Sequence, residues 1–205
     1  VAGVPIFTCA RMGSGTWTRA KGAGEASSTA TVRRADLHCH SEASNQAAEV
    51  ALEAINCPEC YSKPHDVYAQ ATGRGMDFVT ITDHDCIDGC LAIEDKSHVF
   101  ISEQVTTYFP QDTCKIHLLV WGINQGQHQD ISVFRSDICE LQKYLAENRI
   151  AHAVAHPLYS VNGKLTASHL QRLILLFKQF EGINGLRDSL LSDLATKLLR
   201  ELTPE

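Results

Sequence analysis

The chain has 205 residues, of which 44% are apolar and 20% charged, and its formal net charge is −6. This length fits one globular domain with a sizeable core. The acidic balance argues against a broad surface for nucleic acid or anionic membranes. No apolar run approaches the length of a membrane span, so we expect no membrane partner.

Eight cysteines are many for this length, but they do not reach the density of a small disulfide scaffold. Cys39 lies between two histidines, and Cys86 and Cys90 closely follow a third. Because oxidation would disturb such neighbours, we predict a reducing, cytoplasmic setting. Cys57 and Cys60 could join Cys86 and Cys90 in a four-thiolate zinc site, although the spacing favours a loop feature or buried thiols.

Two parts of the chain differ in composition. Residues 8–31 are rich in Gly, Ala, Ser and Thr and lack apolar periodicity, which predicts a flexible N-terminal segment over residues 1–31. Residues 32–205 alternate β-branched runs with helical patterns and form the predicted folded domain. The predicted elements there are, in order, strand 32–38, helix 47–55, helix 64–73, strand 77–82, strand 99–102, strand 115–121, helix 130–147, strand 150–155, helix 166–177, strand 180–183 and helix 189–202.

Strands that alternate with helices indicate parallel βα units, closed as a barrel or open as a doubly wound sheet. In both architectures, ligands collect at the carboxyl ends of the strands. Most of the polar candidates follow a predicted strand, and one lies nearer mid-strand. They are His38, His40, Asp83, His84, Glu103, His117 and His156.

His38 and His40 illustrate why this pattern predicts metal binding. Side chains two residues apart on an extended strand share a face, at about 6–7 Å between Cα atoms, so both imidazoles can reach one ion. Five histidines with one glutamate exceed what a single ion needs, which predicts two or three ions with Glu103 as a bridge. Imidazole and carboxylate ligands suit zinc, manganese or iron. Such a centre generates hydroxide and holds phosphate oxygens, which is hydrolytic machinery.

The motifs resemble those of the PHP family, the polymerase and histidinol phosphatase domains. Asp36-Leu37-His38-Cys39-His40-Ser41 is similar to its first motif, and the run from Gly75 to Asp85 to its second. Glu103 with His117 is similar to the third motif, and His156-Pro157 to the fourth. The resemblance implies a distorted (β/α)7 barrel with up to three metals and phosphoester hydrolysis.

The resemblance also implies roles for individual residues. His38, His40 and Glu103 would hold one metal, Glu103, His117 and His156 a second, and His84 a third. Asp83 would orient a ligand from behind it. Glu103 must therefore lie within bridging distance of His38, His117 and His156.

The sequence departs from the family pattern in two places. Asn45 and Gln46 stand where the family has an Asp or His ligand, and no Asp-x-His pair follows the last strands. We therefore expect an incomplete domain, truncated at its C-terminal end.

A few side chains have two interpretations. Arg187 is a candidate phosphate clamp, or equally an exposed arginine at a helix start. His152 is expected to be a hydrogen-bonded core residue. His65, His98, His128 and His169 are expected to be solvated.

The leading hypothesis is a metal-dependent phosphoesterase acting on a phosphorylated small molecule or nucleotide, with nucleic-acid ends as a further candidate substrate. One rival is a non-catalytic, regulatory PHP-like metal-binding module within a larger protein. A second rival is a structural zinc protein built on the cysteines.

Overall fold

The structure is a computed structural model that describes residues 6–8, 33–44, 57–185 and 189–202. Its strands are β1 (Ile6–Thr8), β2 (Ala35–Asp36), β3 (Phe78–Val79), β4 (Ser102–Phe109), β5 (Cys114–Trp121), β6 (Ala151–Val154) and β7 (Phe180–Ile183). Its helices are α2 (Pro64–Gly73), α3 (Asp88–Leu91), α4 (Gln125–Phe134), α5 (Ile138–Glu147), α6 (Ala167–Leu176) and α7 (Ser189–Leu202). Strands and helices therefore mix as an α/β fold.

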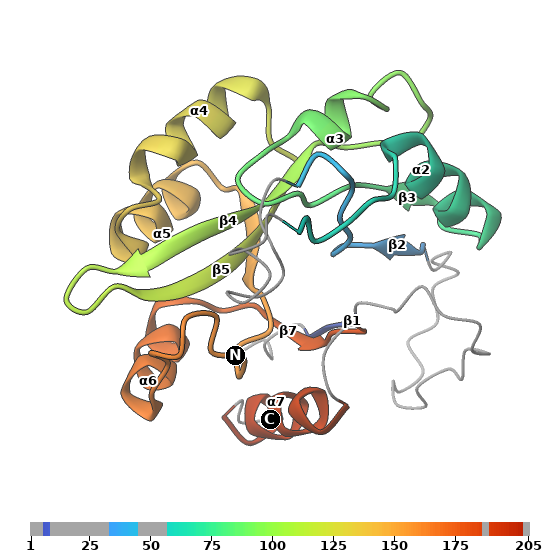
Figure 1. Ribbon diagram of the computed structural model, residues 1–205. Helices are drawn as coiled ribbons and strands as arrows, with labels where there is room; N and C mark the ends of the chain where they lie inside the picture. Colours follow the sequence, from blue (N-terminus) through green and yellow to red (C-terminus); the bar gives the residue numbers. More distant parts are fainter. Residues whose placement is uncertain (1–5, 9–32, 45–56, 186–188, 203–205) are drawn as a thin grey trace, which may run out of the picture.

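The strands form two sheets (Figure 1). Five strands pair in the order β1-β7-β6-β5-β4, and β2 pairs with β3. The expectation of parallel βα units is wrong in the middle of the larger sheet, because β4, β5 and β6 pair antiparallel. The turn between β4 and β5 is too short for the crossover that a parallel pair needs, so these strands form a hairpin.

The two sheets meet without closing into a hydrogen-bonded barrel in the part of the chain that the structure describes. Isolated parallel bridges join Val79 to Val99 and His84 to Gln104. Trp121 on β5 also donates its Nε1–H to the carbonyl oxygen of Leu37, at 2.9 Å. These links bring the ends of β2 and β3 beside β4 and β5.

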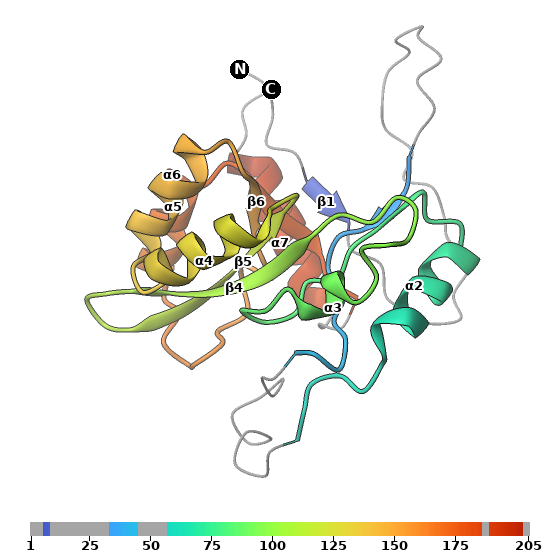
Figure 2. The same cartoon turned by 90° about the horizontal axis from the view of Figure 1, so that it is seen from above.

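Helices flank both sheets, with α5 against β4 of the larger sheet and α2 against β3 of the smaller one. Figure 2 shows α4, α5 and α6 grouped together, with α2 on the far side of the molecule, and α7 packs against β7. The main core lies under α5, where Leu141 and Leu145 pack with Val105 and Leu118. No helix among the described residues is long and apolar enough to cross a bilayer.

The predicted helix 130–147 is two helices in the structure. Asn124 begins α4 with a capping box, in which its side chain and that of Gln127 each accept a backbone N–H of the other residue. Asp137 begins α5, because its side chain accepts the backbone N–H of Cys139. A second capping residue inside a helical pattern thus starts a new helix.

The strand before Glu103 also differs from its prediction. The expected strand 99–102 ends at Glu103, whereas β4 begins at Ser102 and runs to Phe109. The β-branched and aromatic residues from Val105 onward extend the strand. Glu103 therefore stands at the beginning of β4 and not at its carboxyl end.

Other predicted elements fall partly or wholly outside the description. The first strand is reduced to β2, and helix 47–55 lies outside the described residues. Within the predicted flexible segment 1–31, Ile6–Thr8 pair with β7 as β1, and the rest lies outside the described residues.

Candidate metal centre

Five histidines from separate parts of the chain form a ring of contacts. The distances between ring centroids are 5.2 Å for His38–His40, 5.0 Å for His40–His84 and 4.7 Å for His84–His117. The ring closes through His117–His156 at 5.2 Å and His38–His156 at 6.0 Å. The structure therefore brings together all five histidines that the sequence predicts as metal ligands.

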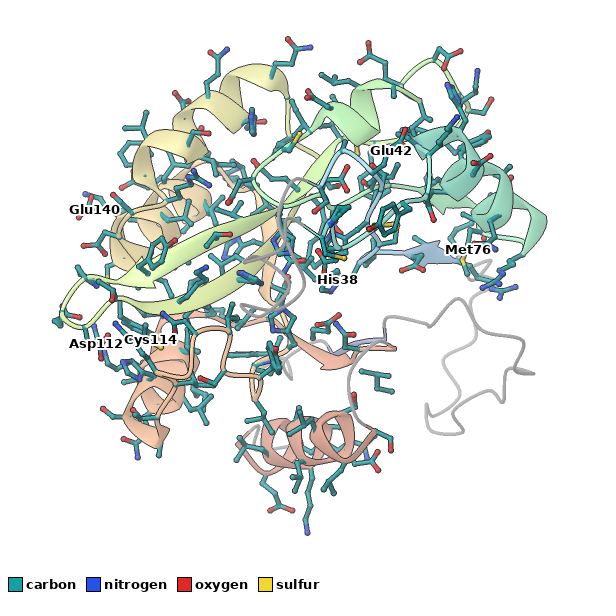
Figure 3. The ribbon with its side chains drawn as sticks, in the orientation of Figure 1. His38, Glu42, Met76, Asp112, Cys114 and Glu140 are labelled. Atoms are coloured by element: carbon teal, nitrogen blue, oxygen red, sulfur yellow. The ribbon has the colours of Figure 1, made fainter. Side chains whose placement is uncertain are left out.

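The backbone holds these side chains in place from several strands. His38 and His40 follow β2, His84 follows β3, His117 lies on β5 and His156 follows β6. The side chain of His38 is 6% exposed and is labelled near the middle of the view in Figure 3. His156 has a positive φ of 29°, an uncommon conformation for a residue with a side chain. Its N–H donates to Glu181 Oε2 at 2.7 Å, which fixes that turn.

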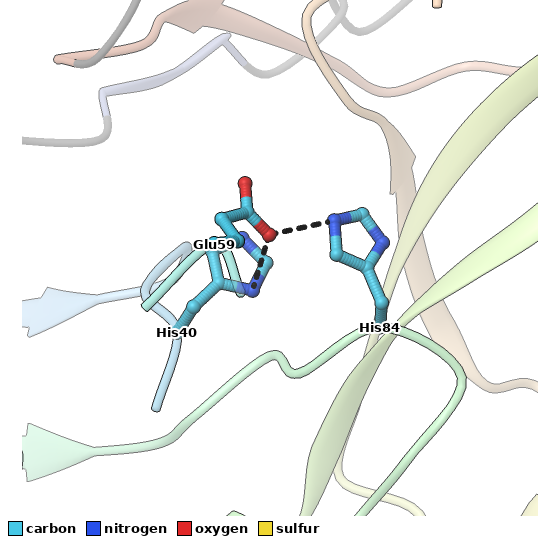
Figure 4. Close-up of side chains that lie close together, drawn as sticks. All are labelled: His40, Glu59 and His84. Carbon is cyan, nitrogen blue, oxygen red and sulfur yellow. Dashed lines mark ion pairs between the residues drawn. The ribbon is translucent and has the colours of Figure 1, made fainter. Parts of the chain in front are cut away.

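Glu59 supplies a carboxylate to two of the histidines (Figure 4). Its Oε2 lies 3.0 Å from His84 Nε2 and 3.9 Å from His40 Nδ1. Neither contact has hydrogen-bond alignment, and Nδ1 of His40 and Oε2 of Glu59 are buried without a hydrogen-bond partner. Three donor atoms that lie within 4.8 Å of one another, of which those of His40 and Glu59 have no hydrogen-bond partner, fit a metal ion.

The charges around Glu59 favour the state that binds metal. Burial raises the pKa of Glu59, but His84 and His40 outweigh burial and lower it to about 2. Burial lowers the pKa of His40 to about 3, although Glu59 opposes this shift. An ionised carboxylate and a neutral imidazole, the forms that ligate a metal, are thus present at neutral pH.

Gln104 joins the other side of the ring. Its Nε2 lies 2.7 Å from His117 Nδ1 and 3.3 Å from His156 Nε2, and its Oε1 lies 2.6 Å from His38 Nε2. An amide nitrogen only donates, so His117 Nδ1 accepts and is unprotonated. Burial, followed by the charge of His156, keeps the pKa of His117 well below its usual value.

The partners of His38 favour its protonated form. Its Nε2–H donates to Gln104 Oε1, and its Nδ1–H donates to Glu181 Oε1 at 2.7 Å. Burial lowers the pKa of His38, but the charge and hydrogen bond of Glu181 outweigh burial and raise it. Glu181 is itself buried, which raises its pKa, but His38 lowers that pKa to about 2. Asn184 donates its amide to both carboxylate oxygens of Glu181 at 3.3 and 3.2 Å.

The structure does not bring Glu103 to the histidines. Successive side chains alternate across a strand, so Gln104 faces the ring and Glu103 faces the other side of β4. There Glu103 Oε2 accepts from His128 Nδ1 at 3.0 Å, and its Oε1 is buried without a partner. Burial raises the pKa of Glu103, while His128 opposes the shift. The predicted bridge between His38, His117 and His156 is thus replaced by an amide.

Asp83 stands behind the centre. Its carboxylate accepts the backbone N–H and the hydroxyl of Ser41, both at 2.6 Å, and so fixes the segment that follows His40. Gly89 lies so close that a Cβ there would stand 2.1 Å from Asp83 Oδ2. This placement fits the predicted orienting role, whereas the placement of Arg187, Asn45 and Gln46 lies outside the described residues.

The remaining histidines differ in part from their predictions. His152 is a half-buried core residue whose Nδ1–H donates to the Ile150 carbonyl at 2.7 Å, as expected. His65 and His98 are exposed, also as expected. His169 is buried: it completes the capping box of α6 and lies 2.8 Å from Asp112 Oδ2. His128 is not simply solvated, because its Nδ1 forms a hydrogen bond with Glu103 Oε2.

The four-thiolate zinc site does not form. Cys90 is buried and donates its S–H to the Ile81 carbonyl at 3.0 Å. Within the described ranges, which include Cys57, Cys60, Cys86 and Cys90, the one group of three or more potential ligands close enough to hold an ion is His40, Glu59 and His84. Sequence reasoning missed Glu59, Gln104 and Glu181. A signal for Gln104 was present, since the β-branched run after it extends the strand and sets which side chain faces the histidines.

No known protein-family profile matches the chain. No curated protein is similar to it in sequence. Among solved structures, it is similar to the crystal structure of a "putative metal-dependent phosphoesterase" from Bifidobacterium adolescentis, with a TM-score of 0.51 and 11% sequence identity. The similarity covers 82% of this chain and 84% of the other. At this identity the similarity supports the shared α/β fold, and no family assignment follows from it.

Proposed function

We propose that this protein is a metal-dependent phosphoesterase related to the PHP domains, with a distorted barrel and a reducing, cytoplasmic setting. The observation that carries the proposal is Glu59 Oε2, buried within ion-pair distance of His40 and His84 and aligned with neither. The neighbouring pair of His117 and His156, with facing nitrogens 3.3 Å apart, is the proposed place of a second ion. The fold shared with a protein described as a phosphoesterase agrees with this function.

We assign the following roles to the residues of this chain. His40, Glu59 and His84 would hold one divalent ion, of zinc, manganese or iron. His117 and His156, whose facing ring nitrogens lie 3.3 Å apart, would supply two ligands to another ion. A metal bound there supplies a hydroxide near neutral pH and a positive site for phosphate oxygens. Asp83 positions His40 through Ser41, and Arg187 remains a proposed phosphate contact.

The surroundings favour a small substrate. A small hollow lies beside His156 and Glu181, with Leu158, Tyr159 and Leu191 in its lining. The net charge of −6 disfavours long polyanionic substrates. We therefore propose a phosphorylated small molecule or a nucleotide as the substrate.

The test measures hydrolysis of p-nitrophenyl phosphate by protein that has been stripped of metal and reloaded with zinc or manganese. We expect turnover only in the loaded protein, and at least about a hundredfold loss in a Glu59→Gln variant, typical of removing a ligand or its support. His65→Gln, on the exposed face of α2, is the matched control. Equal turnover by Glu59→Gln and the unsubstituted protein would overturn the proposal.

Gln104 favours a second candidate function, the non-catalytic metal-binding module. An amide that already holds His38, His117 and His156 leaves no bridging carboxylate at that point. This candidate predicts stoichiometric metal in the Glu59 site with no turnover of any phosphomonoester. Elemental analysis alongside the hydrolysis assay separates the two functions.

A further inference from the structure

The loop that carries Glu59 is flanked by two thiols. Cys57 and Cys60 stand three residues apart, on either side of Pro58 and Glu59, and both are free and partly exposed. The function proposed above uses neither thiol. Their spacing allows a disulfide within the loop, provided that the Cα atoms come within about 7 Å.

Cys60 ties this loop to the metal centre. Its S–H donates to the carbonyl oxygen of His40 at 3.2 Å, and the Ser62 N–H points at its sulfur at 3.4 Å. Glu42 N–H donates to the Ser62 carbonyl at 2.8 Å, so the loop meets the segment after β2 at two points. Glu59 keeps its place beside His40 because these contacts hold the loop.

Cys57 lies beside an exposed aromatic side chain. Its Sγ lies 3.5 Å from the hydroxyl of Tyr61, a side chain that is 71% exposed. Among the described residues its sulfur makes no hydrogen bond to the five histidines, whereas that of Cys60 donates to the His40 carbonyl. Because Cys60 is engaged in this way, Cys57 is the thiol expected to react first.

We propose that Cys57 and Cys60 form a thiol–disulfide site whose oxidation withdraws Glu59 from the metal centre. The part of this inference that concerns metal rests on the proposed function, and the formation of the disulfide does not. The oxidant is a small-molecule disulfide such as oxidised glutathione. In a reducing setting the loop stays in the dithiol state that the structure shows.

The chemistry balances as two successive exchanges. The Cys57 thiolate attacks the small-molecule disulfide, forms a mixed disulfide and releases one thiol. The Cys60 thiolate then attacks the Cys57 sulfur and releases the second thiol. Two cysteine thiols lose two electrons and two protons, and one small-molecule disulfide becomes two thiols.

The second step removes the hydrogen bond that the Cys60 S–H donates to the His40 carbonyl oxygen. Its sulfur cannot both donate a hydrogen to the His40 carbonyl and bond to Cys57. The loop must rearrange, and Glu59, held between the two cysteines, moves with it. Loss of such supporting contacts weakens metal binding by on the order of 10- to 100-fold.

The experiment compares zinc affinity in the reduced and oxidised full chain, by competition with a chromophoric chelator. Peptide mass spectrometry with fragmentation first identifies the bonded cysteines. We expect a Cys57–Cys60 disulfide, zinc binding weakened by on the order of 10- to 100-fold, and full recovery with dithiothreitol. Glu59→Gln should bind zinc weakly in both states.

Two control variants sharpen the result. Cys57→Ser, sorted by mass to exclude protein capped with glutathione, should bind zinc equally before and after treatment, and Cys139→Ser should respond like the unsubstituted protein. Tight zinc binding that survives a mapped Cys57–Cys60 disulfide would overturn the inference and leave the proposed function intact. Failure of the reduced protein to bind zinc would instead overturn the proposed function. Thiols that stay free under oxidised glutathione would reject the disulfide itself.

Discussion

At the scale of single residues, one step along β4 decides which ligands the centre has. Glu103 and Gln104 are neighbours, yet one faces His128 and the other faces His38 and His117. Successive side chains of a strand point to opposite faces, so these two positions have different neighbours. The carboxylates that do reach the histidines, Glu59 and Glu181, come from a loop and from β7.

Replacing Gln104 with glutamate tests this arrangement. A carboxylate at the centre of His38, His117 and His156 can ligate a metal where an amide ligates weakly, so Gln104→Glu should bind a second zinc ion about tenfold tighter, or about 1.4 kcal/mol. Titration calorimetry with elemental analysis measures this change. Gln70→Glu, on the exposed surface of α2, adds the same charge elsewhere and should change nothing. Unchanged zinc binding in Gln104→Glu would show that this part of the ring does not ligate metal.

A second residue-scale prediction concerns Gly89. A methyl group there would meet Asp83 Oδ2 at 2.1 Å and Ser41 Oγ at 2.6 Å, with both atoms held by their mutual hydrogen bond. Overpacking of this kind costs about 1–3 kcal/mol, so Gly89→Ala should lower the free energy of unfolding by that amount in a urea titration. Gly73→Ala, which meets nothing within 4 Å, is the matched control. A Gly89→Ala protein as stable as Gly73→Ala would contradict the close approach.

At the scale of elements, the predictions that the sequence supports best are the ones with local signals. Pro64–Gly73 and Phe180–Ile183 occur as expected, because proline, glycine and β-branched patterns act within a few residues. The pairing of β4 with β5 was missed because the strand was expected to end at Ser102, which hid the short turn between Phe109 and Cys114. Glu59 was missed because no local rule says that a Cys-Pro-Glu-Cys loop folds back onto distant histidines.

The contact between α4 and β4 should make stability depend on pH. The pKa of His128 is raised first by its hydrogen bond to Glu103, although burial opposes the shift. A raised histidine pKa contributes stability that is fully present below the unfolded value of about 6.5 and is lost as pH rises through the folded value. The pKa of Glu103 is raised by burial, so the range to test lies above that pKa, where the carboxylate is ionised.

The measurement compares the metal-free protein with His128→Gln by urea denaturation from about pH 6 to pH 9. His128 should stabilise the protein near pH 6, and its advantage over glutamine should shrink as the pH rises. His65→Gln, at an exposed position, should show no such trend. A difference between His128→Gln and the unsubstituted protein that is constant across this range would exclude a charged His128–Glu103 pair.

At the scale of the whole molecule, the histidine ring is where the two sheets meet. His40 and His84 belong to the segments that follow β2 and β3, whereas His117 lies on β5. The ring centroids of His84 and His117 lie 4.7 Å apart. Among the described residues, only isolated β-bridges join the two sheets there. A metal held in this ring therefore links parts of the fold that little backbone pairing connects.

Metal should consequently stabilise the entire chain and not one loop. Binding to the folded state alone adds about 2.7 kcal/mol at a free concentration a hundred times Kd. We expect zinc to raise the midpoint of thermal unfolding in one cooperative transition, and a chelator to reverse it. Variants His40→Ala and His84→Ala should lose the increase, whereas His65→Ala should keep it, because His65 is exposed on α2. If His40→Ala gains as much stability from zinc as the unsubstituted chain, the ion binds elsewhere, and the ring links the sheets only through its hydrogen bonds.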